Sequence, residues 1–146
     1  MSEILYILMR NDLPSMNAGK AMAQASHASN QFVRFFGDTE AGKRWRNQTT
    51  DGFGTVLVLS ANIEEIKLAE KTAQILALPT QVVIDPTYPY RTNKEIASLI
   101  PTEKDTIPRE VNGDTVTLWR SAITCAFVFG TKEQCQEAVG RLSLHP

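Results

Sequence analysis

Three polar side chains recur at helical spacing in an alanine-rich segment near the start of this 146-residue chain. Lys20, Gln24 and His27 stand at positions i, i+4 and i+7, which places them on one face of a helix. Such a face offers a cation, an amide and an imidazole, and the alanines around it let a ligand approach closely. The same spacing also fits an ordinary solvated helix face, and periodicity by itself favours that interpretation.

Further polar candidates lie later in the chain. Asp85 follows an apolar run, at the point where ligands bind to open α/β sheets, but an aspartate before a proline is equally a common turn opener. The run Lys43-Arg44-Trp45-Arg46 mixes basic and aromatic residues, as a contact to phosphates and bases would. The alternative is a solvated charge run anchored by one tryptophan, which the pattern slightly favours. Arg91 and Thr92 lie in a proline-rich stretch and can be a solvent-facing pair.

Composition excludes several classes of protein. The 15 basic and 16 acidic residues leave a formal charge of −1, so a nucleic-acid site must be a local patch. Cys125 and Cys135 are too few for a disulfide framework and lack zinc spacing, so we expect both to be small buried hydrophobes. We expect no metal, no cofactor and no membrane span. The start of the chain lacks the charged front of a signal peptide, so we expect the cytoplasm.

The elements that position these residues alternate between strands and helices. Apolar runs predict strands at 4–9, 55–60, 81–84 and 123–129. Helical spacing and capping patterns predict helices at 17–36, 62–77 and 131–142. This order predicts one three-layer α/β/α domain over residues 1–146, with a mixed, mainly parallel sheet of about four strands. The stretch 86–114 reads as a long irregular insertion, with a short helix at about 93–99.

Two segments together form a specific compound motif. The first is Met9-Arg10-Asn11-Asp12-Leu13, and the second is Gly19-Lys20-x-x-Ala23-Gln24-x-Ser26-His27-Ala28. The pair resembles the second family of peptidyl-tRNA hydrolases, which is found in archaea and eukaryotes. The resemblance extends to Trp45 before the second strand, to Asp85 after the third, and to a closing helix that ends Gly140-Arg-Leu-Ser-Leu144. These features cover nearly the whole chain in the family's order.

The chain departs from the family pattern at three places. Asn17-Ala18 replaces a lysine that usually precedes the Gly-Lys pair, and Gly54-Thr55 replaces a lysine that opens the second strand. In the family, Gly-Arg-Thr-Gln follows the aspartate almost at once. Here Pro-Thr-Tyr-Pro-Tyr follows Asp85, and Arg91-Thr92 is the candidate equivalent of Arg-Thr.

The resemblance implies hydrolysis of the ester bond between peptide and tRNA in peptidyl-tRNA, which releases free tRNA. On this basis we assign Lys20 to the oxyanion or a phosphate, and Asp85 to orienting the attacking water and holding Lys20. Gln24 would bond the substrate or the water. His27 would be a base or, as we favour, a helper buried against the sheet. Thr92 completes the expected catalytic set.

Peptidyl-tRNA is the expected partner, with a homodimer also considered. The residues expected to bind the tRNA are Lys43, Arg44, Arg46, Tyr90 and Arg91. The segment 86–114 is expected to border the active site, where Tyr88, Tyr90 and Arg91 could stack on an unpaired base or meet a phosphate. Two alternatives remain open on the same fold. One is a non-enzymatic RNA-binding module, and the other is a binder or hydrolase of a small ligand covered by 86–114.

Overall fold

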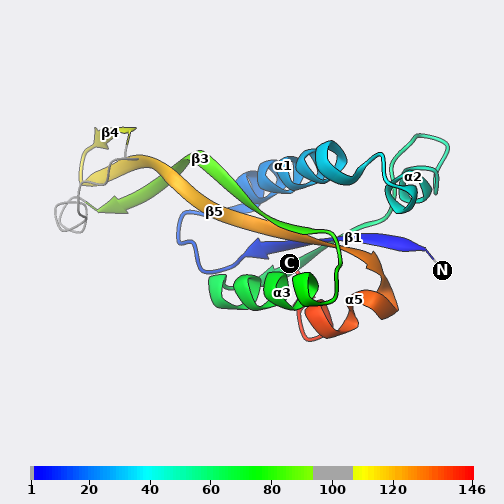
Figure 1. Ribbon diagram of the computed structural model, residues 1–146. Coiled ribbons are helices and arrows are strands. Elements are labelled where there is room, and N and C mark those ends of the chain that lie inside the picture. The colour runs from blue at the N-terminus through cyan, green and yellow to red at the C-terminus, as the bar shows by residue number, and fades with distance from the viewer. Residues whose placement is uncertain (1, 94–106) are drawn as a thin grey trace.

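The computed structural model describes residues 2–93 and 107–146, and within them the chain forms four helices and a six-stranded sheet (Figure 1). The strands are β1 (Glu3–Arg10), β2 (Val56–Ala61), β3 (Thr80–Asn93), β4 (Ile107–Asn112), β5 (Thr115–Thr131) and β6 (Ser143–Leu144). The helices are α1 (Ala18–Phe36), α2 (Glu40–Arg46), α3 (Ile63–Ile75) and α5 (Lys132–Val139). The four strands and three helices predicted outside the stretch 86–114 are all present. α2, β4 and β6 were not predicted from the sequence.

The sheet is larger and less parallel than predicted. Its order is β3-β5-β1-β2-β6, with β4 on the other side of β5 from β3. Only β1 and β2 pair in parallel among the described strands, and the other pairs are antiparallel. The sheet is mixed, as predicted, but the prediction that it is mainly parallel and has about four strands was wrong. The reason is that a helical crossover joins β1 to β2, whereas β5 comes back from a hairpin and enters the sheet antiparallel to β1.

The stretch 86–114 is not irregular where the structure describes it. β3 continues through Pro86 and Pro89 to Asn93, with a register shift between Asp85 and Tyr88. Prolines are tolerated there because β3 is the edge strand of the sheet. The backbone N–H groups that the prolines lack are not needed for hydrogen bonds to a further strand. β4 turns at Gly113, whose φ of 65° suits glycine, into β5. The expected helix at 93–99 lies, apart from Asn93 in β3, outside the described residues.

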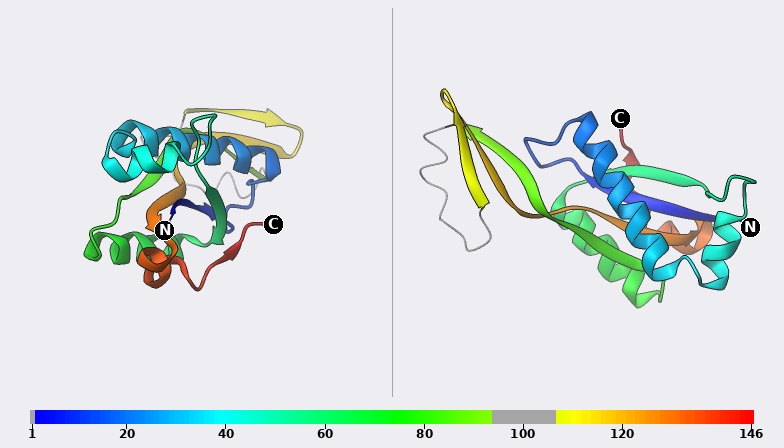
Figure 2. Two further views of the ribbon diagram at one scale, coloured as in Figure 1. Left: turned by 90° about the vertical axis from the view of Figure 1, so that its right-hand side faces the viewer. Right: turned by 90° about the horizontal axis from the view of Figure 1, so that it is seen from above.

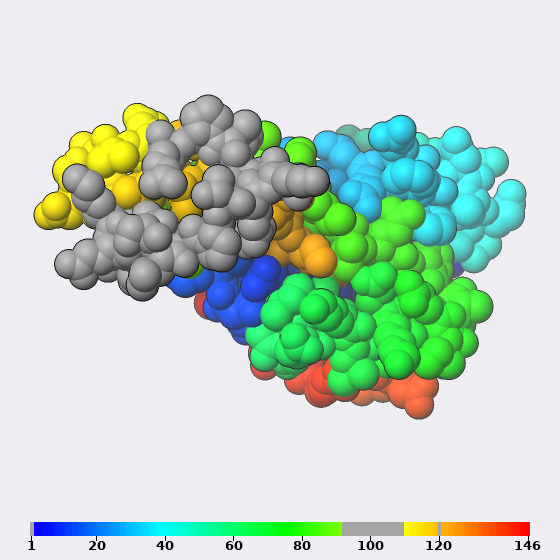
Figure 3. All heavy atoms as spheres, turned by 60° about the vertical axis from the view of Figure 1, so that its left-hand side comes forward, coloured from blue at the N-terminus to red at the C-terminus, as the bar shows by residue number. Residues whose placement is uncertain are grey.

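The outer parts of β3 (88–93) and β5 (115–120), together with β4, project from the body of the molecule as an arm (Figures 1 and 2). The arm has a small apolar cluster of its own, in which Tyr90 packs on buried Val116 and Leu118. Figure 3 shows the arm at one end of the elongated molecule and α2 at the other.

Helices cover both faces of the sheet, which confirms the three-layer prediction. β1 explains why, because nearly all its side chains are buried and alternate between two cores. Leu5, Ile7 and Met9 pack with Phe32 and Trp45 beneath α1 and α2. On the other face, Tyr6 and Leu8 join a cluster with residues of α3 and α5.

Local capping sets where the helices begin. Asn17 caps α1 by accepting a hydrogen bond from the Lys20 amide. The expected start of α3 is a capping box, in which Asn62 and Glu65 accept each other's backbone N–H groups. Thr131 and Gln134 open α5 in the same way. α1 therefore begins soon after β1 ends, which places Lys20 at the carboxyl end of the parallel strands.

Candidate active site

Gln24 is the centre of the polar group on α1. Its side chain is only 4% exposed, and its Nε2 donates to Asp85 Oδ2 at 2.7 Å. The fully buried Thr124 hydroxyl of β5 donates to Gln24 Oε1 at 2.6 Å. These two bonds orient the amide, because its oxygen faces a donor and its nitrogen faces a carboxylate. The structure therefore joins two predicted site residues, Gln24 and Asp85, which stand 61 positions apart in the sequence.

Lys20 lies one turn before Gln24 on the same helix face. Its Nζ donates to the backbone carbonyls of Ser15, at 3.1 Å, and of Pro89, at 3.2 Å. The ammonium also lies 5.4 Å from the centre of the Tyr88 ring, within the range of a cation–π contact. Burial lowers the pKa of Lys20, and the positive charge of Arg91 lowers it further.

Asp85 is half-buried in β3, opposite Ala122 of β5. Besides Gln24, it accepts a hydrogen bond from the Thr87 amide, at 2.9 Å to Oδ1. Among the described residues it forms no ion pair with Lys20, which carbonyl oxygens hold instead. The expectation that Asp85 holds Lys20 was therefore wrong. β3 follows the direction of β1, since both are antiparallel to β5, so Asp85 still lies near the carboxyl end of β1.

His27 does not complete this group. Its side chain is exposed, so the expectation of a helper buried against the sheet was wrong. Gln24 is buried on this face of α1, but His27 lies at its solvent-exposed edge. The residue that is buried one turn after Gln24 is Ala28. A spacing of i, i+4 and i+7 shows that residues share a face, but it does not show which end of that face is covered.

Thr124 is the site residue that the sequence analysis missed. Thr124 is a hydroxyl-bearing residue within the apolar stretch 123–129, and a buried polar side chain requires a partner. That signal could have singled it out, although not its contact with Gln24. The neighbouring Cys125 is buried, as expected, and burial raises the pKa of its thiol to about 12. Cys125 is therefore a neutral thiol near neutral pH.

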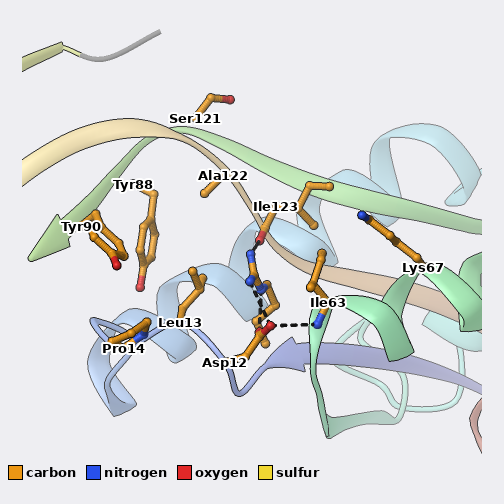
Figure 4. Close-up of a pocket in the computed structure, with 11 residues that line it drawn as sticks. Asp12, Leu13, Pro14, Ile63, Lys67, Tyr88, Tyr90, Ser121, Ala122 and Ile123 are labelled. Carbon is orange, nitrogen blue, oxygen red and sulfur yellow. Dashed lines mark hydrogen bonds and ion pairs between the residues drawn. The ribbon is translucent and has the colours of Figure 1, made fainter. Parts of the chain in front are cut away.

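Arg10 and Asp12, from the first half of the compound motif, form an ion pair at the mouth of a pocket (Figure 4). Arg10 also donates to the Ile123 carbonyl at 3.1 Å, and Asp12 accepts from the Ile63 amide at the start of α3. The bond from Arg10 holds the pKa of Asp12 below its usual range, with the Ile63 amide adding to this effect. The pocket has a volume of about 420 Å³ and lies between the 11–17 segment, α3 and the base of the arm.

The arm carries the remaining predicted residues of this region. Arg91 is exposed and close enough to Lys20 to lower its pKa. Tyr88 and Tyr90 both line the pocket, and Tyr88 is only 1% exposed. Thr92 pairs with Val116 through the backbone, and its side chain lies outside what the structure describes.

Lys43, Arg44 and Arg46 are not part of this group. They lie on α2, beyond the far end of α1 and near the beginning of β1 (Figure 1). Lys43 is exposed, Arg46 pairs with Asp38 at 3.3 Å, and Arg44 pairs with Glu3 at 2.7 Å. Glu3 is 6% exposed, so Arg44 neutralises a buried carboxylate. The structure thus separates these residues from Lys20 by the length of the helix.

The layered sheet and the polar group of Lys20, Gln24 and Asp85 define a single α/β domain with a site for polar chemistry at the carboxyl end of β1. Residues 4–145 match the family described as peptidyl-tRNA hydrolase PTH2, and the chain belongs to that family. The search of curated proteins gave no match. None of the helices within the described residues is long and apolar enough to cross a membrane.

A solved structure with a similar fold is that of a protein of unknown function from Agrobacterium tumefaciens strain C58. The two chains superpose with a TM-score of 0.57 at 9% sequence identity, over 100% of this chain and 99% of the other. At this identity the comparison shows the fold alone.

Proposed function

We propose that this protein hydrolyses the ester bond that joins a peptide to the 3′ end of a tRNA. The observation that carries the proposal is the bond from Gln24 to Asp85, with Lys20 one turn away on the same helix. These are the residues that the family resemblance singles out, and they come from two elements far apart in the sequence. Family membership supports the same reaction.

In the proposed reaction, Asp85 is the general base. Its Oδ1 accepts from both the amide and the hydroxyl of Thr87, whereas its Oδ2 accepts from Gln24 and keeps a second lone pair for a water molecule. The water oxygen attacks the ester carbonyl carbon while its proton passes to the carboxylate. The bond to the ribose 3′-oxygen then breaks, and that oxygen takes up the proton held by Asp85, which restores the carboxylate. The carboxylic acid formed on the peptide releases its proton to solvent. The products are a peptide with a free carboxylate and a tRNA with a 3′-hydroxyl.

Lys20 supplies the positive charge that this reaction needs. Two of its three N–H groups donate to the carbonyls of Ser15 and Pro89, which fixes the ammonium in place. Within the described residues the third N–H has no hydrogen-bond acceptor, and it would donate to the oxyanion that forms on the ester carbonyl. A donor fixed before the reaction stabilises the transition state without a reorganisation cost.

The test is cleavage of N-acetyl-aminoacyl-tRNA by the purified protein, with free aminoacyl-tRNA as the control substrate. Lys20→Ala should lower kcat by about 10²- to 10³-fold, the usual effect of losing one oxyanion donor. The melting temperature should hardly change, because Lys20 belongs to neither apolar core. Absence of cleavage by the wild-type protein, or full activity of the variant, would contradict the proposal.

A further inference from the structure

We propose that the pocket beside Arg10 binds the unpaired 3′-terminal nucleotide of the tRNA, with the base against Tyr90 and a phosphate near Lys67. This inference rests on the proposed function, since it names the part of the substrate that enters next to the reacting ester. The pocket volume of about 420 Å³ lies within the range of sites that hold one small ligand.

The aromatic wall comes from the base of the arm. Tyr88 and Tyr90 are two positions apart in β3, so both side chains lie on the same face of the strand, and Figure 4 shows them side by side. Tyr88 is buried, and its hydroxyl accepts a hydrogen bond from Ser15 at 3.2 Å, so it is held in place. Tyr90 is half-buried and packs on Val116 and Leu118. A supported ring of this kind is a platform on which an unpaired base stacks.

The charged wall lies on the other side of the pocket. Lys67 extends from α3 toward Ile123 (Figure 4). Arg10 also lines the pocket and bonds both the Ile123 carbonyl and Asp12. Asp12 pairs with Arg10, so the lining of two cations and one carboxylate keeps an excess of one positive charge. Lys67 is exposed and carries that excess at the pocket edge. A nucleotide presents an aromatic ring and a negative phosphate, which matches both walls.

Tyr88 connects this pocket to the candidate catalytic group. The Lys20 ammonium lies 5.4 Å from the centre of the Tyr88 ring, and the same side chain lines the pocket. A nucleotide in the pocket is therefore separated from Lys20 by the width of one side chain. A peptide side chain in this pocket could contact its apolar lining, but peptide side chains do not always carry a negative charge that would pair with Lys67. A nucleotide can contact both the aromatic wall and Lys67, so it fits the lining residues better than a peptide side chain does.

Binding of the trinucleotide CCA, the sequence at the 3′ end of tRNA, tests the subsite without hydrolysis. Tyr90→Ala should raise the Kd for CCA by about 5- to 100-fold, which is the effect of losing one stacking ring. Tyr90→Phe keeps the ring and should retain most of the affinity. Lys67→Ala should flatten the slope of log affinity against log salt by about 0.7. Lys71→Ala is the matched control, because Lys71 lies one turn further along α3 and does not line the pocket.

Steady-state kinetics on N-acetyl-aminoacyl-tRNA separate this inference from the proposed function. Tyr90→Ala should raise KM by a factor similar to its effect on Kd, with little change in kcat. If the wild-type protein cleaves the substrate while the variants keep its KM and the Kd for CCA, the subsite is wrong and the proposed function stands. A rise in KM without a change in the Kd for CCA would assign the pocket to the peptide and overturn the inference. If the wild-type protein binds CCA through Tyr90 without cleaving peptidyl-tRNA, the proposed function is wrong.

Discussion

At the scale of single residues, the site depends on how one amide is oriented. A glutamine side chain can turn end for end, and only its partners decide which atom faces the carboxylate. Thr124 supplies the donor to Gln24 Oε1, so the amino group faces Asp85. The three side chains come from β5, α1 and β3 and are positioned by the sheet, not by a loop. A site built on regular elements keeps its geometry between turnovers.

Replacing Thr124 tests this orientation. Thr124→Val removes the hydroxyl and leaves the buried Gln24 oxygen without its donor, which should lower the free energy of unfolding by about 1–3 kcal/mol. We expect kcat/KM on peptidyl-tRNA to fall as well, because the amide can then turn away from Asp85. Thr124→Ser keeps the hydroxyl and should restore most of the activity. Equal activities of the Val and Ser variants would show that Gln24 does not need this donor.

The pH dependence of activity tests the charge of Lys20. Burial and Arg91 both lower the pKa of Lys20, so it loses its proton at a lower pH than an exposed lysine. Only the ammonium stabilises an oxyanion, so kcat/KM should fall as the pH rises through this pKa. Arg91→Gln removes the neighbouring positive charge, and the falling limb of the profile should move to higher pH.

Lys132→Gln, on α5 in the opposite layer, is the control for this shift, because Lys132 is exposed and is not a proposed tRNA contact. Its profile should overlap that of the wild-type protein. A falling limb that Arg91→Gln leaves in place would mean that another group controls the alkaline side.

At the scale of elements, the consecutive helices α1 and α2 position different groups of residues. α1 begins directly after the turn that leaves β1, so it brings Lys20 and Gln24 to the carboxyl edge of the sheet. α2 anchors Trp45 in the core, where its indole donates to the Thr55 carbonyl at 2.8 Å, and leaves basic residues on its surface. These basic residues remain our proposed second contact to the tRNA.

Salt dependence tests the contact made by α2. Lys43→Ala and Arg46→Ala together should flatten the slope of log affinity for tRNA against log salt by about 0.7–0.9 for each lost phosphate contact. Arg44 is kept, because its removal would leave the buried Glu3 carboxylate without a cation. The double variant Lys71→Ala and Lys132→Ala changes the same number of charges on the opposite layer. An unchanged slope in the α2 variant places the tRNA on another surface.

At the scale of the whole molecule, two cores on opposite faces of one sheet hold the domain together. Phe32 is the centre of the core beneath α1, fully buried, with its ring 4.4 Å from that of Phe129 and 5.2 Å from that of Trp45, measured between centroids. Because this core carries α1, the stability of the domain and the position of the site depend on the same contacts. The arm, with its separate small cluster, adds to the site without adding to either core.

A pair of phenylalanines on α1 tests the contribution of this core. Phe32→Ala should lower the free energy of unfolding by about 3–5 kcal/mol, through lost burial and the cavity that remains. Phe35, on the same helix, is 55% exposed, and Phe35→Ala should change stability by less than about 0.5 kcal/mol. Urea unfolding followed by circular dichroism measures both. Similar losses for the two variants would contradict the assignment of the core.

The sequence by itself determined the elements that depend on local signals. Apolar runs, helical spacing and the capping boxes at Asn62 and Thr131 predicted seven elements and two of the helix starts, because these features act within a few residues. The alternation of strands and helices predicted three layers. The compound motif pointed to Lys20 and Gln24, and the wider family resemblance pointed to Asp85.

Only the tertiary structure decided how distant segments pair. Strand direction, the continuation of β3 through two prolines and the return of β5 depend on partners many residues away, which no local pattern encodes. The same holds for burial, since His27 and Gln24 share one helix face but only Gln24 meets the sheet. Thr124 joined the site because β5 passes beneath α1, and α2 stayed apart from the site because α1 separates them. Long-range packing therefore decided which of the candidate residues meet.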